Sequence, residues 1–191
     1  MREDIRLALL LLDKASRTHE EQGALKSMVD RMDADGKKQL KESHVFIRFA
    51  ATTRLLDDPF DHQNEAPPRP DISVSADGRK YYFELSEITD KLLAKALSNS
   101  AKTGSIGGLA ISPIGPLETR LKRKCESTYQ IDNANIDLLL YYWRHEPMES
   151  VPEYMDSKPE LTSLLGKSPF SRIWVFQLYP PEVLWSFSSE R

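Results

Sequence analysis

The 191-residue chain has one cysteine, Cys125, and no long apolar run. A single cysteine excludes an intramolecular disulfide and is typical of a protein in a reducing compartment. No segment approaches the roughly 18 consecutive apolar residues of a membrane span. The first residues include acids where a signal peptide carries bases, and the apolar run at 7–12 is short, with no cleavage site after it. We therefore expect a cytoplasmic protein that does not associate with membranes.

The chain also lacks the signatures of several enzyme classes. Its four histidines are scattered without the spacing of metal ligands, which argues against structural zinc. There is no Gly-x-Ser-x-Gly motif of a serine hydrolase. The glycine-rich stretch at 98–116 matches neither a phosphate-binding loop nor a dinucleotide fingerprint. That stretch predicts a long loop, which is either a lid that contacts substrate or a plain linker.

An excess of positive charge is missing as well. The net charge is −3, whereas a domain whose only task is to coat nucleic acid is usually strongly basic. A nuclease is not excluded, because the acidic residues of a metal site offset basic patches elsewhere. The basic cluster 120–124, with Lys91, Lys95 and Lys102 nearby in sequence, indicates either phosphate contacts or a solvated helix face.

What is present is the composition of an ordinary globular protein, with 40% hydrophobic and 29% charged residues. The order of the helices and strands predicted below is that of a mixed α/β sandwich. The length suits one domain, with an N-terminal helical extension over 1–36 and a core over 37–191. Helical periodicity predicts helices at 3–33, 37–56, 90–97, 117–130 and 152–165. Residues 33–36 predict a turn and 57–70 a polar connector. Strands are predicted for a hairpin within 69–88 and at 136–143, 172–178 and 183–187. The last strand is expected at a sheet edge, where a second copy could pair with it to form a homodimer.

The hairpin is the most informative segment of the chain. An Asp77-Gly78 pair suits the two positions of a tight turn that require positive φ. Counting outward from a two-residue turn places Asp71 directly opposite Glu84, with Cβ atoms about 5 Å apart. Two carboxylates so placed repel each other, and a divalent cation between them would reverse the sign of that interaction. The hairpin therefore predicts a metal site.

Pro70-Asp71, followed by Glu84-Leu85-Ser86 on the next strand, resembles the PD-(D/E)xK nuclease superfamily. The core order of that family, helix, antiparallel strands, helix, strand, matches residues 37–143. The resemblance implies a restriction-endonuclease-like three-layer sandwich, with a mixed sheet flanked by helices. It implies a nuclease that cuts phosphodiester bonds of DNA or RNA, with Asp71 and Glu84 as ligands of Mg²⁺ or Mn²⁺. An upstream helical glutamate often assists in this family, and Glu42 is the candidate.

The chain departs from the family at Ser86, which stands where the motif lysine is expected. A hydroxyl cannot supply that positive charge, although it could hold water or phosphate. Some members carry the lysine on the following helix, and a helical wheel of 117–130 places Lys124 on the border of the buried stripe. Lys124 is therefore the candidate displaced catalytic lysine. Arg120, the next residue outward, and Lys102 are candidates for substrate binding.

A second class of function remains open at this point. The same fold could be kept as a catalytically inactive interaction module, an immunity or regulatory protein that binds a protein or nucleic-acid partner. The missing motif lysine and the acidic balance favour this alternative. A third alternative is a metal-binding hydrolase that is not a nuclease. The discriminating feature is whether Lys124 or Arg120 points at the two carboxylates.

Overall fold

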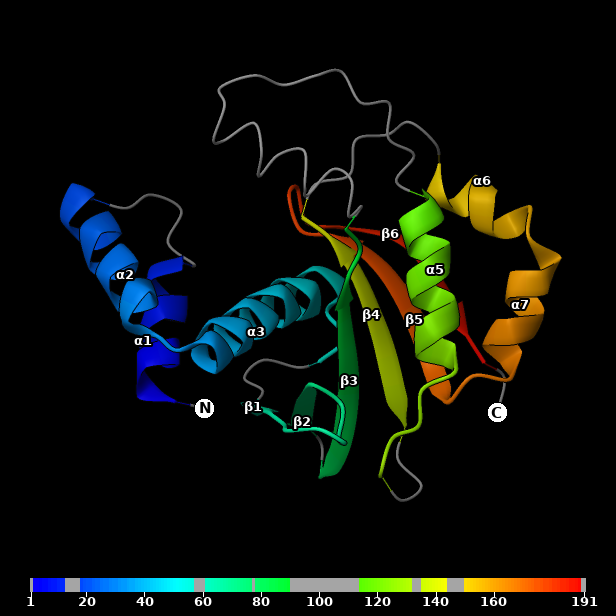
Figure 1. Ribbon diagram of the computed structural model, residues 1–191, viewed down its shortest axis with the longest axis horizontal. Helices are drawn as coiled ribbons and strands as arrows, with labels where there is room; N and C mark the ends of the chain where they lie inside the picture. The colour runs from blue at the N-terminus through cyan, green and yellow to red at the C-terminus, as the bar shows by residue number, and fades with distance from the viewer. Residues whose placement is uncertain are drawn as a thin grey trace.

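The computed structural model describes residues 2–12, 18–56, 61–76, 78–89, 114–131, 135–143 and 150–189. These residues form an α/β fold of helices around a single sheet (Figure 1). The helices are α1 (Glu3–Leu12), α2 (His19–Arg31), α3 (Ala34–Thr53), α5 (Ile114–Cys125), α6 (Val151–Asp156) and α7 (Pro159–Gly166). The strands are β1 (Asp61–Asn64), β2 (Ile72–Ala76), β3 (Arg79–Glu87), β4 (Ile136–Tyr142), β5 (Phe170–Gln177) and β6 (Glu182–Ser188). No helix among these has the length and apolarity that crossing a membrane requires.

The sheet is mixed and open, with its strands in the order β1-β2-β3-β4-β5-β6. The central strands β3, β4 and β5 run parallel, while the outer neighbours pair antiparallel. β4 is buried along its whole length, as expected for a parallel strand that is covered on both faces. The predicted strand at 183–187 corresponds to β6, which lies at one edge of the sheet.

Helices cover both faces of the sheet, so the fold has three layers (Figure 1). On one face α3 packs through Phe46 and Phe49 against Phe83 of β3. On the other face α5, α6 and α7 bury the opposite side chains of β4 and β5. α1 and α2 join α3 in a small separate cluster, in which Ile5 packs with Leu40. The coarse prediction of a mixed sheet flanked by helices is confirmed.

The hairpin has the register that a two-residue turn predicts. Ala76 pairs with Arg79 and Ser73 with Tyr82, and Gly78 has a φ of +71°. A residue with a side chain rarely adopts that conformation, so glycine suits the turn. The last pair of the ladder is formed by Ile72, which places Asp71 just beyond the paired region.

Two long predicted helices are each divided in two. The single helix predicted at 3–33 is α1 and α2, and α2 begins at a capping box in which Thr18 and Glu21 cap each other's backbone amides. The helix predicted at 152–165 is α6 and α7, with a break at Lys158, which has φ −121° and ψ 75°. The next residue is Pro159, and a proline disfavours the helical conformation of the residue before it.

Three further boundaries are wrong. The predicted turn at 33–36 is the start of α3, where Asp33 caps the helix by accepting a hydrogen bond from the Gly36 amide at 2.7 Å. The predicted connector at 57–70 contains β1. α5 begins at Ile114 and ends at Cys125, earlier than predicted at both ends. The predicted helix at 90–97 and residues 98–113 of the loop predicted at 98–116 lie outside the described residues, and residues 114–116 belong to α5.

Candidate functional site

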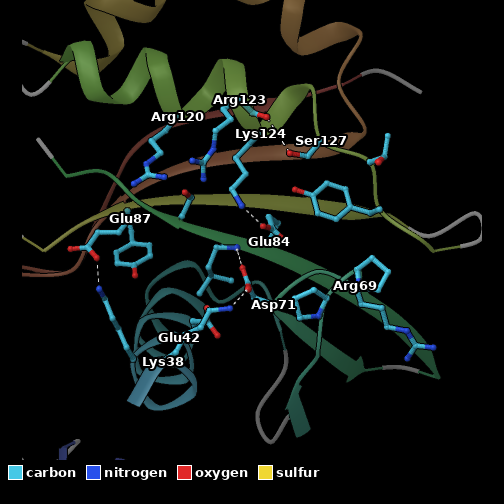
Figure 2. Close-up of a pocket in the computed structure, with 18 of the residues that line it drawn as sticks. Lys38, Glu42, Arg69, Asp71, Glu84, Glu87, Arg120, Arg123, Lys124 and Ser127 are labelled. Carbon is cyan, nitrogen blue, oxygen red and sulfur yellow. Dashed lines mark hydrogen bonds and ion pairs between the residues drawn. The ribbon is translucent and has the colours of Figure 1, made fainter. Parts of the chain in front are cut away.

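A pocket of about 540 Å³ lies between α3 and α5, where β2 separates from β3 (Figure 2). Its lining contains more basic than acidic side chains, although the whole chain is acidic. The charged lining residues are Lys38, Lys41, Arg69, Arg120, Arg123 and Lys124, together with Glu42, Asp71, Glu84 and Glu87. The pocket therefore combines clustered carboxylates with a net positive wall.

Asp71 is fixed at the free edge of β3. Beyond its last pair with β2, β3 continues from Glu84 to Glu87 and pairs only with β4 on its other side. The Leu85 amide would be left without a strand partner there, and it donates instead to Asp71 Oδ2 at 3.0 Å. The expected strand pair between Asp71 and Glu84 is thus replaced by a contact from carboxylate to backbone, which still holds both acids in one pocket.

Lys124 reaches from α5 to Glu84 and forms an ion pair with Oε1 of that carboxylate (Figure 2). The exposed fractions of the two side chains are 15% and 9%, so the pair is shielded from solvent. Burial raises the pKa of Glu84, the charge of Asp71 raises it further, and the hydrogen bond from Lys124 lowers it. The inward direction that the helical wheel predicts for Lys124 is the direction observed.

Lys38 of α3 contacts two other carboxylates of the pocket. Its Nζ lies 3.2 Å from Asp71 Oδ1 and 3.3 Å from Glu42 Oε1. Burial raises the pKa of Glu42 to about 8, with the charge of Asp71 as the second cause. The protonated form of Glu42 is therefore favoured compared with that of an exposed glutamate. Lys38 was not predicted as a site residue, because its only local signal in the sequence is the i,i+4 spacing to Glu42.

Glu87 lies on the opposite face of β3 from Glu84, as strand alternation predicts. It forms an ion pair with Lys41 of α3. Ser86 shares the Glu84 face and is also buried. All of these side chains line one pocket, because the pocket wraps around the free edge of β3.

Arg120 and Arg123 project from α5 toward β3 (Figure 2). Neither forms an ion pair with an acidic side chain within the described part of the chain. Guanidinium groups bind phosphate oxygens through paired hydrogen bonds, so this wall suits a phosphate group. Arg123 was not predicted as a site residue, because the helical wheel places it away from the buried stripe.

Mg²⁺ and Mn²⁺ prefer oxygen ligands, which the carboxylates of the pocket provide. Among the described residues, no three histidine, cysteine, aspartate or glutamate side chains already surround one point. Mg²⁺ is, however, commonly held by one or two carboxylates and several waters. Asp71 raises the pKa of both Glu42 and Glu84, which means that a cation among these acids would relieve their repulsion. The carboxylates of Asp71 and Glu84 therefore fit such an ion, provided that Lys38 moves away from Asp71 Oδ1.

The structure brings most predicted site residues together. Lys102 lies outside the described residues. Six of the predicted site residues line this pocket, namely Asp71, Glu84, Ser86, Glu42, Lys124 and Arg120.

No protein-family model matches the chain, and neither a curated protein nor a solved structure matches it significantly. The case for a function therefore depends on the chemistry of the pocket.

Proposed function

We propose that the protein is a metal-dependent nuclease that cuts phosphodiester bonds of DNA or RNA, with the restriction-endonuclease-like form of the three-layer fold. One observation carries the proposal. Lys124 of α5 pairs with Glu84 beside Asp71, which puts a buried positive charge next to two carboxylates. Lys124 thus provides, from the following helix, the positive charge that Ser86 cannot supply.

Asp71 and Glu84 would hold Mg²⁺ or Mn²⁺, which supplies a Lewis acid and a bound water of lowered pKa. Lys124 would stabilise the negative charge that develops on the attacking oxygen and on the phosphate in the transition state. Glu42, with a pKa of about 8, is suited to exchange a proton with water near neutral pH. Ser86 can donate its hydroxyl to a water or to a phosphate oxygen.

Substrate binding would use the arginines of the pocket. Arg120 and Arg123 extend from α5, and Arg69 lines the pocket from the segment before β2. A phosphodiester backbone that crosses the pocket would meet the guanidinium groups of Arg120 and Arg123 beside the two carboxylates. Such contacts position the chain without reading its sequence.

A binding module without catalysis is the second candidate, and one observation favours it. Asp71 and Glu84 are each paired with a lysine, Lys38 and Lys124 respectively. The site is therefore electrostatically balanced without a metal ion. In that case the basic pocket would hold an anionic partner and leave it intact.

Cleavage assays separate the two candidates. Plasmid DNA and labelled RNA would be incubated with the protein and Mg²⁺, Mn²⁺ or EDTA. The variants are Glu84→Gln, which keeps the shape of the side chain but removes its charge, and Glu118→Gln, a control on α5 outside the pocket. We expect metal-dependent cleavage that falls at least about 100-fold in Glu84→Gln and persists in Glu118→Gln.

Two results would reject the nuclease proposal in different ways. If the wild-type protein cuts neither substrate with any metal, the binding module becomes the better account, and a pull-down for partners follows. If Glu84→Gln cuts as fast as the wild type, the chemistry takes place elsewhere on the chain.

A further inference from the structure

Trp143 and Tyr179 form an exposed aromatic pair at the carboxyl ends of β4 and β5. Their exposed fractions are 41% and 40%, and in the described part of the chain only Leu7 and Leu10 are large apolar side chains of similar or greater exposure. The two rings are stacked, with centroids 6.1 Å apart and planes 16° from parallel. A solvent-exposed cluster of aromatic side chains commonly marks a binding site.

The pair is held in place by the surrounding structure. The Tyr179 amide donates to the Trp143 carbonyl at 3.1 Å, which continues the pairing of β4 with β5. The Tyr179 hydroxyl is hydrogen-bonded to His44 Nε2 of α3 at 2.8 Å. A rigid aromatic surface loses little entropy when a flat ligand stacks on it.

Cations flank the pair and connect it to the nuclease pocket. The ammonium of Lys41 lies 5.7 Å from the centre of the Trp143 ring, and the guanidinium of Arg48 lies 5.2 Å from the centre of the Tyr179 ring. Lys41 also lines the pocket. Tyr141, another lining residue, precedes Trp143 by two positions and therefore projects to the same side of the strand, about 7 Å away.

We infer that Trp143 and Tyr179 are a stacking site for unpaired bases of a single-stranded nucleic acid whose phosphates enter the pocket. Every base has a flat face that can stack on an aromatic ring, and the guanidinium of Arg48 beside the pair would attract the backbone. In a duplex these faces are hidden between neighbouring base pairs. The inference deepens the proposed function by naming single-stranded nucleic acid as the substrate, and it rests on that function only for the cleavage step.

Binding in EDTA tests the site without requiring catalysis. Fluorescence anisotropy would follow labelled 12-nucleotide DNA and RNA strands, a blunt duplex of the same sequence, and a strand in which abasic positions keep the phosphates but remove the bases. The variants are Trp143→Ala, Trp143→Phe and Leu10→Ala, the last a control at an apolar residue of α1 that is more exposed than Trp143. Circular dichroism checks the fold of each variant.

We expect the wild type to prefer the single strands to the duplex. Trp143→Ala should weaken binding of an intact strand about tenfold, while Trp143→Phe and Leu10→Ala keep most of the affinity. The abasic strand should bind weakly and equally to the wild type and Trp143→Ala. The inference is overturned if the wild type binds no strand, or if Trp143→Ala loses nothing on intact strands or loses as much on abasic ones.

The two proposals fail separately. If the protein binds single strands through Trp143 but never cuts them, the stacking site is supported and the nuclease proposal is rejected. If the protein cuts nucleic acid and Trp143→Ala changes neither the rate nor the affinity, the nuclease proposal is supported and the stacking site is rejected.

Discussion

The two helical walls of the pocket balance their charges differently. On α3, Lys38 is paired with Asp71 and Glu42, and Lys41 is paired with Glu87. On α5, Lys124 is paired with Glu84, whereas Arg120 and Arg123 have no acidic partner within the described residues. The lysines of the α3 wall are therefore neutralised by acidic side chains. The α5 wall presents positive charge without an acidic partner to an incoming phosphate.

This difference distinguishes basic residues that neutralise nearby acids from basic residues that can attract phosphate, which the sequence alone does not do. Lysines that already neutralise carboxylates contribute little further attraction for a polyanion. The arginines retain that attraction, and their planar groups match phosphate geometry. We therefore expect substitutions of the basic residues on α5 to lower catalysis and affinity, and substitutions on α3 to change stability and its pH dependence more than affinity.

The largest effect is expected from Lys124→Met. Removing this charge should lower the rate of metal-dependent cleavage at least about 100-fold, because the methionine fills the space but cannot stabilise a negative transition state. Lys122→Met is the matched control, since Lys122 pairs with Glu118 on the exposed side of the same helix. Rates are compared by single-turnover cleavage of labelled substrate. Full activity in Lys124→Met would mean that another group supplies the charge.

An intermediate effect is expected when both arginines of the α5 wall are neutralised. The double variant Arg120→Gln/Arg123→Gln should bind a single strand about tenfold more weakly at 0.1 M salt, with a salt slope smaller by about 1.4. The control Lys122→Gln/Lys167→Gln removes the same charge from exposed positions outside the pocket. Anisotropy titrations at several salt concentrations give both quantities. Equal slopes in the two double variants would contradict the assignment of phosphate contacts to this wall.

The smallest effect is expected on α3, where Glu42→Gln should change the pH dependence of stability. Burial raises the pKa of Glu42 from 4.5 to about 8 in the folded chain. The folded protein therefore keeps a proton that the unfolded chain releases, and stability falls as the pH rises from 4.5 through 8. At pH 8.5 the variant should be more stable than the wild type by roughly 1 kcal/mol, since solvent and Lys38 reduce the penalty.

Urea unfolding in EDTA at pH 5 and pH 8.5 measures this change. Glu20→Gln, an exposed substitution on α2, serves as the control. An identical pH dependence in Glu42→Gln and the wild type would show that Glu42 titrates normally.

Local chemistry explains what could be predicted from the sequence. The Asp77-Gly78 pair determines the hairpin register, because the turn type sets which residues face each other. The inward direction of Lys124 follows from the 100° spacing of residues on one helix. Both features depend only on residues close together in the chain. The division of the first helix was also visible locally, since Thr18 and Glu21 have the spacing of a capping box.

Tertiary contacts explain what could not be predicted. Lys38 and Lys41 reach the pocket because α3 crosses the face of the sheet beside the free edge of β3, and no pattern within α3 reports this. β1 is short and polar, and it forms by pairing with β2 while its His62 packs against Phe46. The strand predicted at 136–143 includes Trp143, yet this residue is exposed just after β4.

The most direct test of the central claim, that Asp71 and Glu84 act as one site, is calorimetric titration with Mn²⁺. The account predicts saturable binding to the wild type and to Glu118→Gln, and loss of that binding in Asp71→Asn and in Glu84→Gln. A wild type that binds no Mn²⁺, or single variants that bind it as well as the wild type, would contradict the claim.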